Sequence, residues 1–231
     1  MTNTVAPPAS LAARWAAALF PHRALLSGHR WRARRLAFGF PDAGFAFSWR
    51  SDWTEGFLPL PEAGRAAFRR AYARWAAACG LELVETDAPS ALSRVFVTEA
   101  DLGANEGEGW PRLGYGYYPG DLPGSGDVWL TTEVLRRSWG DGGLNLFTAV
   151  HEVGHTLGLK HPHEGSPAMP AAFDRWSWTV MSRRPAAGST VRGTPRDLPA
   201  YPDRPAPLDV RAVRLLYGAP PRLPPSSSSW A

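Results

Sequence analysis

The run from His151 to His161 (HEVGHTLGLKH) restricts the local fold more than any other part of this 231-residue chain. On a helix, residues four apart share a face, so His151 and His155 present their imidazoles in the same direction. Gly158 allows the chain to leave the helix in a backbone conformation that other residues resist. After that turn, His161 returns toward the helix. The spacing therefore predicts a helix, a glycine turn and three imidazoles that meet at one point.

Three converging imidazoles suit a zinc ion, which at catalytic sites keeps its fourth position open. Glu152 lies one step round the helix from His151 and can accept a proton from a water molecule at that position. The short motif of His151, Glu152 and His155 arises by chance in roughly a few per hundred chains of this length, and adding Gly158 and His161 lowers the chance to about one in ten thousand. The run therefore indicates hydrolytic zinc chemistry rather than histidines packed in a core helix.

The remaining histidines and the single cysteine are expected to have structural positions. His163 follows three nitrogen ligands that already suffice, so it is not expected to bind the metal. His22 and His29 are expected at the surface or in structural contacts. Cys79 closes an apolar helical pattern and is expected to be a small buried residue, and with one cysteine no intrachain disulfide can form.

Hydrophobic periodicity predicts alternating helices and strands. From Pro61 to Cys79 the apolar residues recur at helical spacing, and Gly80 is a suitable stop. Further helices are expected at 11–26, with a break at Pro21, at 144–159 and at 207–217. Strands are expected at 36–40, 45–49, 81–85, 94–98, 113–118 and 127–132. This order predicts an α+β (α/β-like) fold in which a mixed twisted sheet is backed by helices.

Composition argues against several classes of partner. The formal charge of +4 comes from arginines scattered along the chain, with Lys160 as the only lysine. The nearest approach to a basic cluster, at 30–35, is small for phosphate recognition, so no nucleic-acid partner is expected. No run approaches the roughly 18 apolar residues that a membrane span needs. The N-terminal residues also lack the pattern of a signal peptide.

A second element farther along the chain supports the metal site. Met181 lies in the segment 178–182 (WTVMS), about twenty residues after His161. Together with the extended histidine motif, this segment resembles the Met-turn of the metzincin metallopeptidases, in which the methionine packs beneath the metal-binding histidines. The resemblance implies that Met181 takes this position.

Within the metzincins, other segments resemble the serralysin group. These are 24–28 (ALLSG) followed by Trp31, 114–120 (GYGYYPG), 126–129 (GDVW), 207–213 (PLDVRAV) and 216–218 (LYG). The resemblance covers residues 22–219 and implies that they form a catalytic domain with the zinc helix under the cleft. A partly disordered N-terminal extension is then expected at 1–21, and a disordered Pro/Ser-rich tail at 220–231.

The resemblance implies a zinc-dependent endopeptidase that cleaves an extended polypeptide, with Zn²⁺ on the three histidines and Glu152 as general base. The strand that contains Gly114, Tyr115, Gly116 and Tyr117 is expected to form the rim of the cleft and to pair with the substrate main chain. The resemblance also implies a secreted protein, with a cytoplasmic location as the alternative. A monomer is expected.

Two departures from the serralysin pattern matter. A tyrosine usually stands two positions after the methionine, where it adds to the zinc shell or steadies the oxyanion, and this chain has Arg183 there. A guanidinium cannot bind zinc but can stabilise negative charge if it points inward, whereas the favoured expectation is that it points to solvent. The Gly/Asp-rich calcium-binding repeats that usually follow the catalytic domain also have no counterpart in this sequence.

These departures keep a second hypothesis open, a zinc-bound binding or toxin-like module of the same fold with little or no proteolysis. A DNA-associated or purely structural role is a remote third. Structural Ca²⁺ is also open, with ordinary loop acids as an equal alternative. The candidate calcium ligands are the acids of Gly-rich loops, Asp101, Glu106, Glu108, Asp121 and Asp127.

Overall fold

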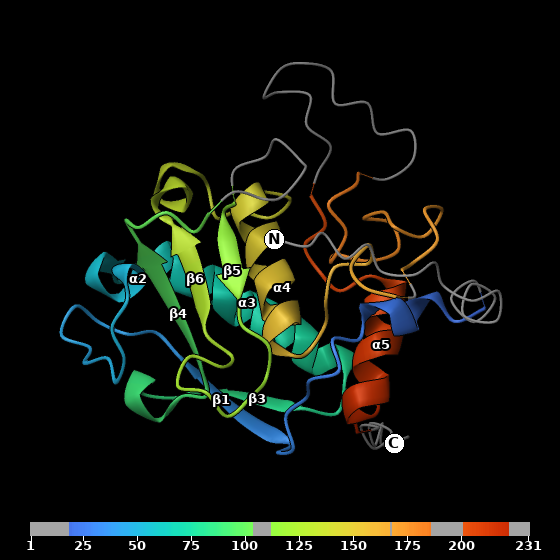
Figure 1. The fold of residues 1–231 in the computed structure, drawn as a ribbon, viewed down its shortest axis with the longest axis horizontal. Coiled ribbons are helices and arrows are strands. Elements are labelled where there is room, and N and C mark those ends of the chain that lie inside the picture. The colour runs from blue at the N-terminus through green and yellow to red at the C-terminus, as the bar shows by residue number, and fades with distance from the viewer. Residues whose placement is uncertain (1–18, 104–111, 167, 186–200, 222–231) are drawn as a thin grey trace, which may run out of the picture.

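A computed structural model of the chain describes residues 19–103, 112–166, 168–185 and 201–221 (Figure 1). Its helices are α2 (Asp52–Glu55), α3 (Glu62–Ala78), α4 (Leu144–Thr156) and α5 (Pro207–Tyr217), with 3-10 helices η1 (Pro21–Leu25), η2 (Ala88–Ser90) and η3 (Thr132–Arg136). Its strands are β1 (Arg35–Gly39), β2 (Phe57–Leu58), β3 (Glu82–Glu85), β4 (Ser93–Thr98), β5 (Gly114–Gly116) and β6 (Val128–Thr131). The α+β class with a mixed sheet is thereby confirmed.

The expected domain limits stay predictions. Residues 1–18 and 222–231, which carry most of the expected extension and tail, lie outside the described residues. The same holds for the first part of the helix expected at 11–26, of which 21–25 form η1. Among the described helices, none is both long and apolar enough to cross a membrane.

The six strands form one sheet, in the order β3-β1-β4-β6-β5, and β2 pairs with the end of β4. β3, β1, β4 and β6 run parallel to one another, whereas β5 is antiparallel to β6 and β2 is antiparallel to β4. β5 is therefore an edge strand whose outer backbone groups have no strand partner within the described part of the chain. In Figure 1 it lies beside α4, the helix that carries two of the three histidines.

Helices α3 and α4 pack against each other on one face of the sheet (Figure 1). The contact is built on Trp75 of α3, which is fully buried and donates from its indole N–H to the carbonyl oxygen of Val150 in α4, at 2.9 Å. Cys79, at the end of α3, is completely buried as expected, and burial raises the pKa of its thiol. These buried contacts thus fix α4 against α3.

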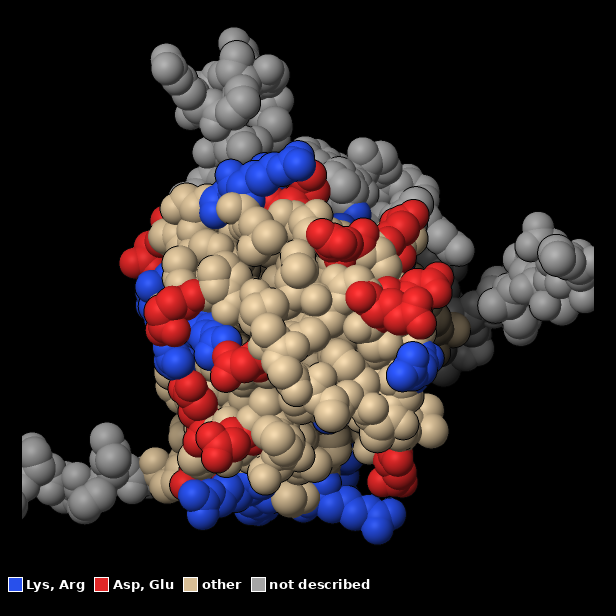
Figure 2. All heavy atoms as spheres, turned by 90° about the vertical axis from the view of Figure 1, so that its left-hand side faces the viewer, with Lys and Arg blue, Asp and Glu red and all other residues tan. Residues whose placement is uncertain are grey.

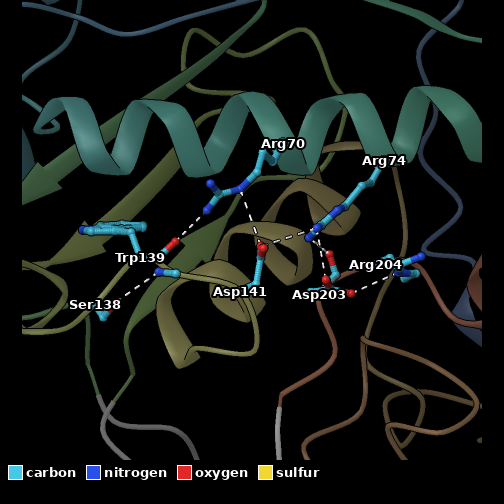
Figure 3. A network of polar contacts seen from close by, with 8 residues as sticks. Arg70, Arg74, Ser138, Trp139, Asp141, Asp203 and Arg204 are labelled. Carbon is cyan, nitrogen blue, oxygen red and sulfur yellow. Dashed lines mark hydrogen bonds and ion pairs between the residues drawn. The ribbon is translucent and has the colours of Figure 1, made fainter.

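Polar contacts at the solvent side of α3 fasten the segments that precede α4 and α5 (Figure 3). Arg70 and Arg74 both approach Asp141, in the loop before α4, with N–O distances of 4.0 and 3.7 Å. Arg74 also pairs with Asp203, before α5, at 3.0 Å, and Asp203 pairs with Arg204. Asp141 and Arg204 are each 73% exposed, so their pairs contribute little to stability, whereas Arg74 and Asp203, 22% and 24% exposed, form the most protected pair of this group.

The strand expected at 45–49 is wrong, because this segment forms no strand. Its alternating aromatic residues instead lie on the face of the sheet away from α3 and α4. Phe45 packs edge-on against Phe96 of β4, and Phe47 stacks on Trp129 of β6, with ring centroids 5.8 and 5.9 Å apart. Side-chain packing on a sheet produces the same alternation in sequence as membership of the sheet.

Arg94 joins this aromatic layer to a buried carboxylate. Its guanidinium donates to both oxygens of Asp127, at 2.8 Å each, and lies over the ring of Trp49. Asp127 is fully buried and both of its oxygens accept from Arg94, so one of the carboxylates considered for calcium is already engaged.

On the face shown in Figure 2, acidic and basic side chains are interspersed around an uncharged centre, and basic groups gather only near its edges.

Candidate metal centre

Helix α4 and the turn after it place the three histidines. α4 ends at Thr156, three residues earlier than expected, because Gly158 takes a φ of +95°. A β-carbon at Gly158 would lie 2.2 Å from the carbonyl oxygen of His29, so only glycine fits. Beyond the turn, the N–H of Lys160 donates to the carbonyl oxygen of Leu25 at 2.7 Å. His161 is thereby directed back toward α4, as the sequence predicts.

The Nε2 atoms of the three histidines converge. The Nε2 of His161 lies 3.1 Å from that of His151 and 3.2 Å from that of His155. Two nitrogens bound tetrahedrally to one zinc ion would lie roughly 3.3 Å apart, given a Zn–N distance of about 2.0–2.1 Å. All three side chains are buried, with at most 8% of each residue exposed. The spacing and the donor type both fit a zinc ion.

The Nδ1 atoms on the far side of each ring fix which nitrogen faces the centre. Nδ1–H of His151 donates to the carbonyl oxygen of Val180 at 2.8 Å, and that of His155 to the carbonyl oxygen of Leu159 at 2.7 Å. Nδ1 of His161 lies 2.5 Å from a carboxylate oxygen of Glu164. Each Nε2 is therefore left with a lone pair that points inward.

The protonation states agree with this arrangement. Burial is the main cause that lowers the pKa of His151 to about 4, and it also lowers the pKa values of His155 and His161. All three imidazoles are therefore neutral at pH 7. The inward lone pair of His161, 3.1 and 3.2 Å from the Nε2 atoms of His151 and His155, repels theirs unless a cation lies between them, which is the chemistry of a metal site.

Glu152 is buried next to the histidines, and its Oε2 has no hydrogen-bond partner among the described residues. Burial raises its pKa to about 8, whereas the Gly116 N–H and the charges of Arg183 and Arg112 act in the opposite direction. A divalent cation nearby would favour the carboxylate further. A buried carboxylate with one unpartnered oxygen beside three converging imidazoles is the arrangement expected of a proton acceptor.

Strand β5 lies directly over Glu152. A β-carbon at Gly114 would lie 2.8 Å from Cγ of Glu152, and one at Gly116 would lie 2.6 Å from its carbonyl oxygen. Tyr115 and Tyr117 alternate with these glycines and are more than a third exposed. Glycine on the inner side of the strand thus permits the close approach of its backbone to the site.

Met181 is in contact with α4, the helix that carries His151 and His155. It is fully buried, and a β-carbon at Gly154 would lie 2.5 Å from its Sδ. The turn that carries it is held by Asp209 of α5. The carboxylate of Asp209 accepts from the Thr179 hydroxyl at 2.5 Å, and from the N–H groups of Val180 and Ala206 at 2.8 Å each.

Asp209 is a residue whose contribution the sequence did not indicate. Because Asp209 holds the N–H of Val180, the residue whose carbonyl oxygen accepts from His151, it helps to orient this candidate metal ligand through one intermediate residue. The only local signal is an acid in the first turn of a helix that begins with Pro207, which ordinarily predicts a helix cap.

The substitution Asp209→Asn should destabilise the fold by about 1–3 kcal/mol, because an amide leaves a buried N–H or O–H donor without an acceptor. Chemical denaturation at pH 7 measures the effect. Asp141→Asn is the control, since this carboxylate is 73% exposed and its ion pairs are long, and it should cost less than about 1 kcal/mol. Equal losses in the two variants would contradict the role of Asp209.

Arg183 follows the Met181 turn and is half-buried. Its positive charge lowers the pKa values of Glu152, His151 and His161. The residue before Arg183, Ser182, is held in place because its hydroxyl donates to the buried Asp174 at 2.6 Å. The charge of Arg183 therefore acts electrostatically on the titratable side chains of the candidate metal centre.

Three ring contacts complete the surroundings. Tyr118 packs edge-on against His155, with centroids 5.7 Å apart, and His29 stacks on Tyr118. His163 is exposed and stacks on His161, with centroids 5.5 Å apart. Its ring lies outside the group of His151, His155 and His161.

Comparison with known proteins agrees with the geometry. A family model described as Matrixin (Peptidase_M10) matches residues 58–180, about half of the chain. Serralysin C of Dickeya chrysanthemi is 32% identical over 46% of this chain and 23% of its own length. Metalloprotease AprA of Pseudomonas entomophila is 29% identical over 55% of this chain and 30% of its own length. Matrix metalloproteinase-25 of Mus musculus is 31% identical over 59% of this chain and 22% of its own length. The aligned region thus spans less than a third of each of these relatives.

Proposed function

The chain belongs to the matrixin family, with a serralysin-like metzincin fold, and we propose that it is a zinc-dependent endopeptidase that cleaves protein substrates. The observation that carries the proposal is the convergence of three inward Nε2 lone pairs beside the unpartnered Oε2 of Glu152. His151, His155 and His161 would hold the ion. Bound zinc supplies Lewis acidity toward a peptide carbonyl and a water molecule.

Glu152 is proposed as the general base. Its buried carboxylate would take the proton of the attacking water and pass it to the amine that leaves, so one group acts first as base and then as acid. The unpartnered Oε2 supports this role, because a carboxylate engaged in structural hydrogen bonds would be a weaker acceptor. The α4 helix keeps Glu152 in a fixed relation to His151 and His155.

Strand β5 is proposed to bind the substrate as an additional antiparallel strand. Its outer edge has no strand partner among the described residues, and Gly114 and Gly116 bring its backbone close to Glu152. A peptide paired there would be extended, and the main-chain hydrogen bonds would be independent of sequence. The side chains of Tyr115 and Tyr117 would remain on the opposite side of the rim.

Arg183 is proposed to stabilise negative charge that develops on the substrate carbonyl oxygen. The proposal rests on its position after the Met181 turn and on its electrostatic effect at Glu152. A cation directed at developing charge lowers the barrier without binding the metal.

Arg183→Ala should therefore lower kcat by roughly tenfold to a hundredfold, less than the loss of a fully buried oxyanion donor. Steady-state kinetics on a peptide substrate measure the effect, and Arg183→Lys should retain part of the rate. Arg184→Ala is the control, because Arg184 pairs with Asp174 from an exposed position. If Arg183→Ala and Arg184→Ala have the same kcat as the unchanged protein, Arg183 has no such role.

The proposed activity is tested by casein cleavage. The purified protein should cleave casein, lose this activity when a chelator removes zinc, and regain it when one equivalent of zinc is restored. Zinc binding without any cleavage would favour the alternative function, a zinc-bound binding or toxin-like module. Cleavage that survives complete removal of metal would contradict both.

Secretion stays a prediction from the resemblance to serralysins, and a monomeric state and structural calcium stay predictions from the sequence. Of the acids considered for calcium, Asp127 already bonds Arg94, and Glu106 and Glu108 lie outside the described residues. Asp101 accepts from the N–H of Gly103 at 2.8 Å in an exposed loop. Calcium therefore has less support here than zinc.

A further inference from the structure

The three metal-binding histidines differ in what holds the far side of each ring. His151 and His155 donate to main-chain carbonyl oxygens, those of Val180 and Leu159. His161 is paired with a side chain, the carboxylate of Glu164, at 2.5 Å. Both of the first two residues also lie on α4, whereas His161 lies beyond its end. The third ligand is thus fixed by different means from the other two.

The loop after His161 is built so that Glu164 reaches the ring. The N–H of Glu164 donates to the carbonyl oxygen of His161 at 3.2 Å, which closes a turn. The ammonium of Lys160, the only lysine, donates to the carbonyl oxygen of Glu164. Gly165, with a φ of +71°, then leads the chain away. These contacts hold the backbone of Glu164, so the carboxylate does not depend on a flexible surface loop.

A carboxylate that accepts from Nδ1–H changes the properties of an imidazole more than a carbonyl oxygen does. It fixes the tautomer with the lone pair on Nε2 and increases the basicity of that nitrogen, which strengthens its bond to a metal. For a ligand outside the helix, it also restricts rotation of the ring. The ring of His163 stacks on a face of the His161 ring, at an interplanar angle of 3°.

We propose that Glu164 is a positioning residue that orients His161 and thereby retains zinc in the metal centre. The proposal rests on the proposed function, since it concerns the same metal site. Glu164 would not touch the substrate carbonyl or the water; it would act through the imidazole of His161. Loss of the carboxylate should weaken zinc binding more than it lowers the stability of the fold, because the side chain of Glu164 is 42% exposed.

The test is the zinc affinity of Glu164→Ala, measured by competition with a chromophoric chelator. We expect the dissociation constant to rise by roughly 10–100-fold, the usual effect of removing an outer-shell partner of a metal ligand. Glu164→Gln keeps an acceptor oxygen without the charge, so its affinity should lie between those of Glu164→Ala and the unchanged protein. The absorption spectrum of the cobalt-substituted protein should shift in Glu164→Ala, because the geometry at His161 changes.

Glu133→Ala is a matched control. Glu133 pairs with Arg136 three residues on, as Glu164 pairs with His161, and its side chain has the same 42% exposure. It should leave the zinc affinity and the cobalt spectrum unchanged. The melting temperatures of the metal-free proteins should agree, which separates a positioning role from a general loss of structure.

A zinc affinity of Glu164→Ala equal to that of Glu133→Ala would overturn the inference, as would a Glu164→Gln variant no better than Glu164→Ala. Failure of the proposed function has a different signature. In that case the unchanged protein itself binds no zinc or, when loaded, cleaves no casein, whatever residue stands at position 164.

Discussion

Replacing Glu152 by alanine is expected to lower kcat/KM for casein by about 10²–10⁴-fold, the range for loss of a general base. The three imidazoles are independent of this side chain, so the variant should still bind one zinc ion per chain. The structure also predicts the effect on stability. Because Glu152 is buried and its Oε2 has no partner among the described residues, removing it should leave the melting temperature unchanged or raise it.

The measurement combines steady-state kinetics, metal content and thermal unfolding on the same preparations. Glu152→Gln is the informative companion, since it keeps the size of the side chain but cannot accept the proton in the same way. Both variants should be inactive and zinc-loaded. An alanine variant that retains more than a tenth of the rate would show that another group takes the proton. A variant that loses zinc would show that Glu152 supports the metal site rather than the chemistry.

Gly158→Ala is expected to destabilise the fold by about 2–6 kcal/mol, from backbone strain together with overpacking. A β-carbon there would meet the His29 carbonyl oxygen at 2.2 Å, and the φ of +95° is unfavourable for any other residue. The turn that returns His161 would have to move. Zinc affinity should therefore fall together with stability, although Gly158 contacts no metal.

Gly28→Ala is the control for this substitution. Gly28 has a similar φ of +91°, but a β-carbon there would have nothing within 4 Å. Gly28→Ala should lower the free energy of unfolding only by the backbone strain, about 1–3 kcal/mol, and should leave the zinc affinity unchanged. Denaturant unfolding and chelator competition measure both quantities. If the two glycine variants are equally stable and bind zinc equally well, the contact with His29 does not shape the turn.

The sequence predicted the parts of this molecule that follow from local rules. Helical spacing indicated α3 and α5 with an error of one residue at most at each end. The histidine run predicted both the helix and its glycine stop, because one turn of helix and one positive φ are local properties. The strand at 45–49 failed since alternation records which side chains are buried, not which backbone is paired.

What the sequence did not predict depends on contacts between distant segments. Asp209 acts at the Met181 turn only because α5 packs there, 28 residues after Met181 along the chain. Glu164 is close to His161 in sequence, but its role requires a loop held by Lys160. The hydrogen bond between the Ser182 hydroxyl and Asp174, eight residues apart, holds the segment next to Arg183, and no local pattern predicts it.

The central claim is that His151, His155 and His161 together hold one catalytic zinc ion. It is tested most directly by the metal content of the unchanged protein and of His161→Ala, measured by elemental analysis after dialysis against zinc-free buffer, with casein cleavage on the same samples. We expect one zinc per chain and cleavage from the unchanged protein, and neither from His161→Ala. Full zinc content and cleavage in His161→Ala, or cleavage by an unchanged protein that contains no metal, would contradict the account.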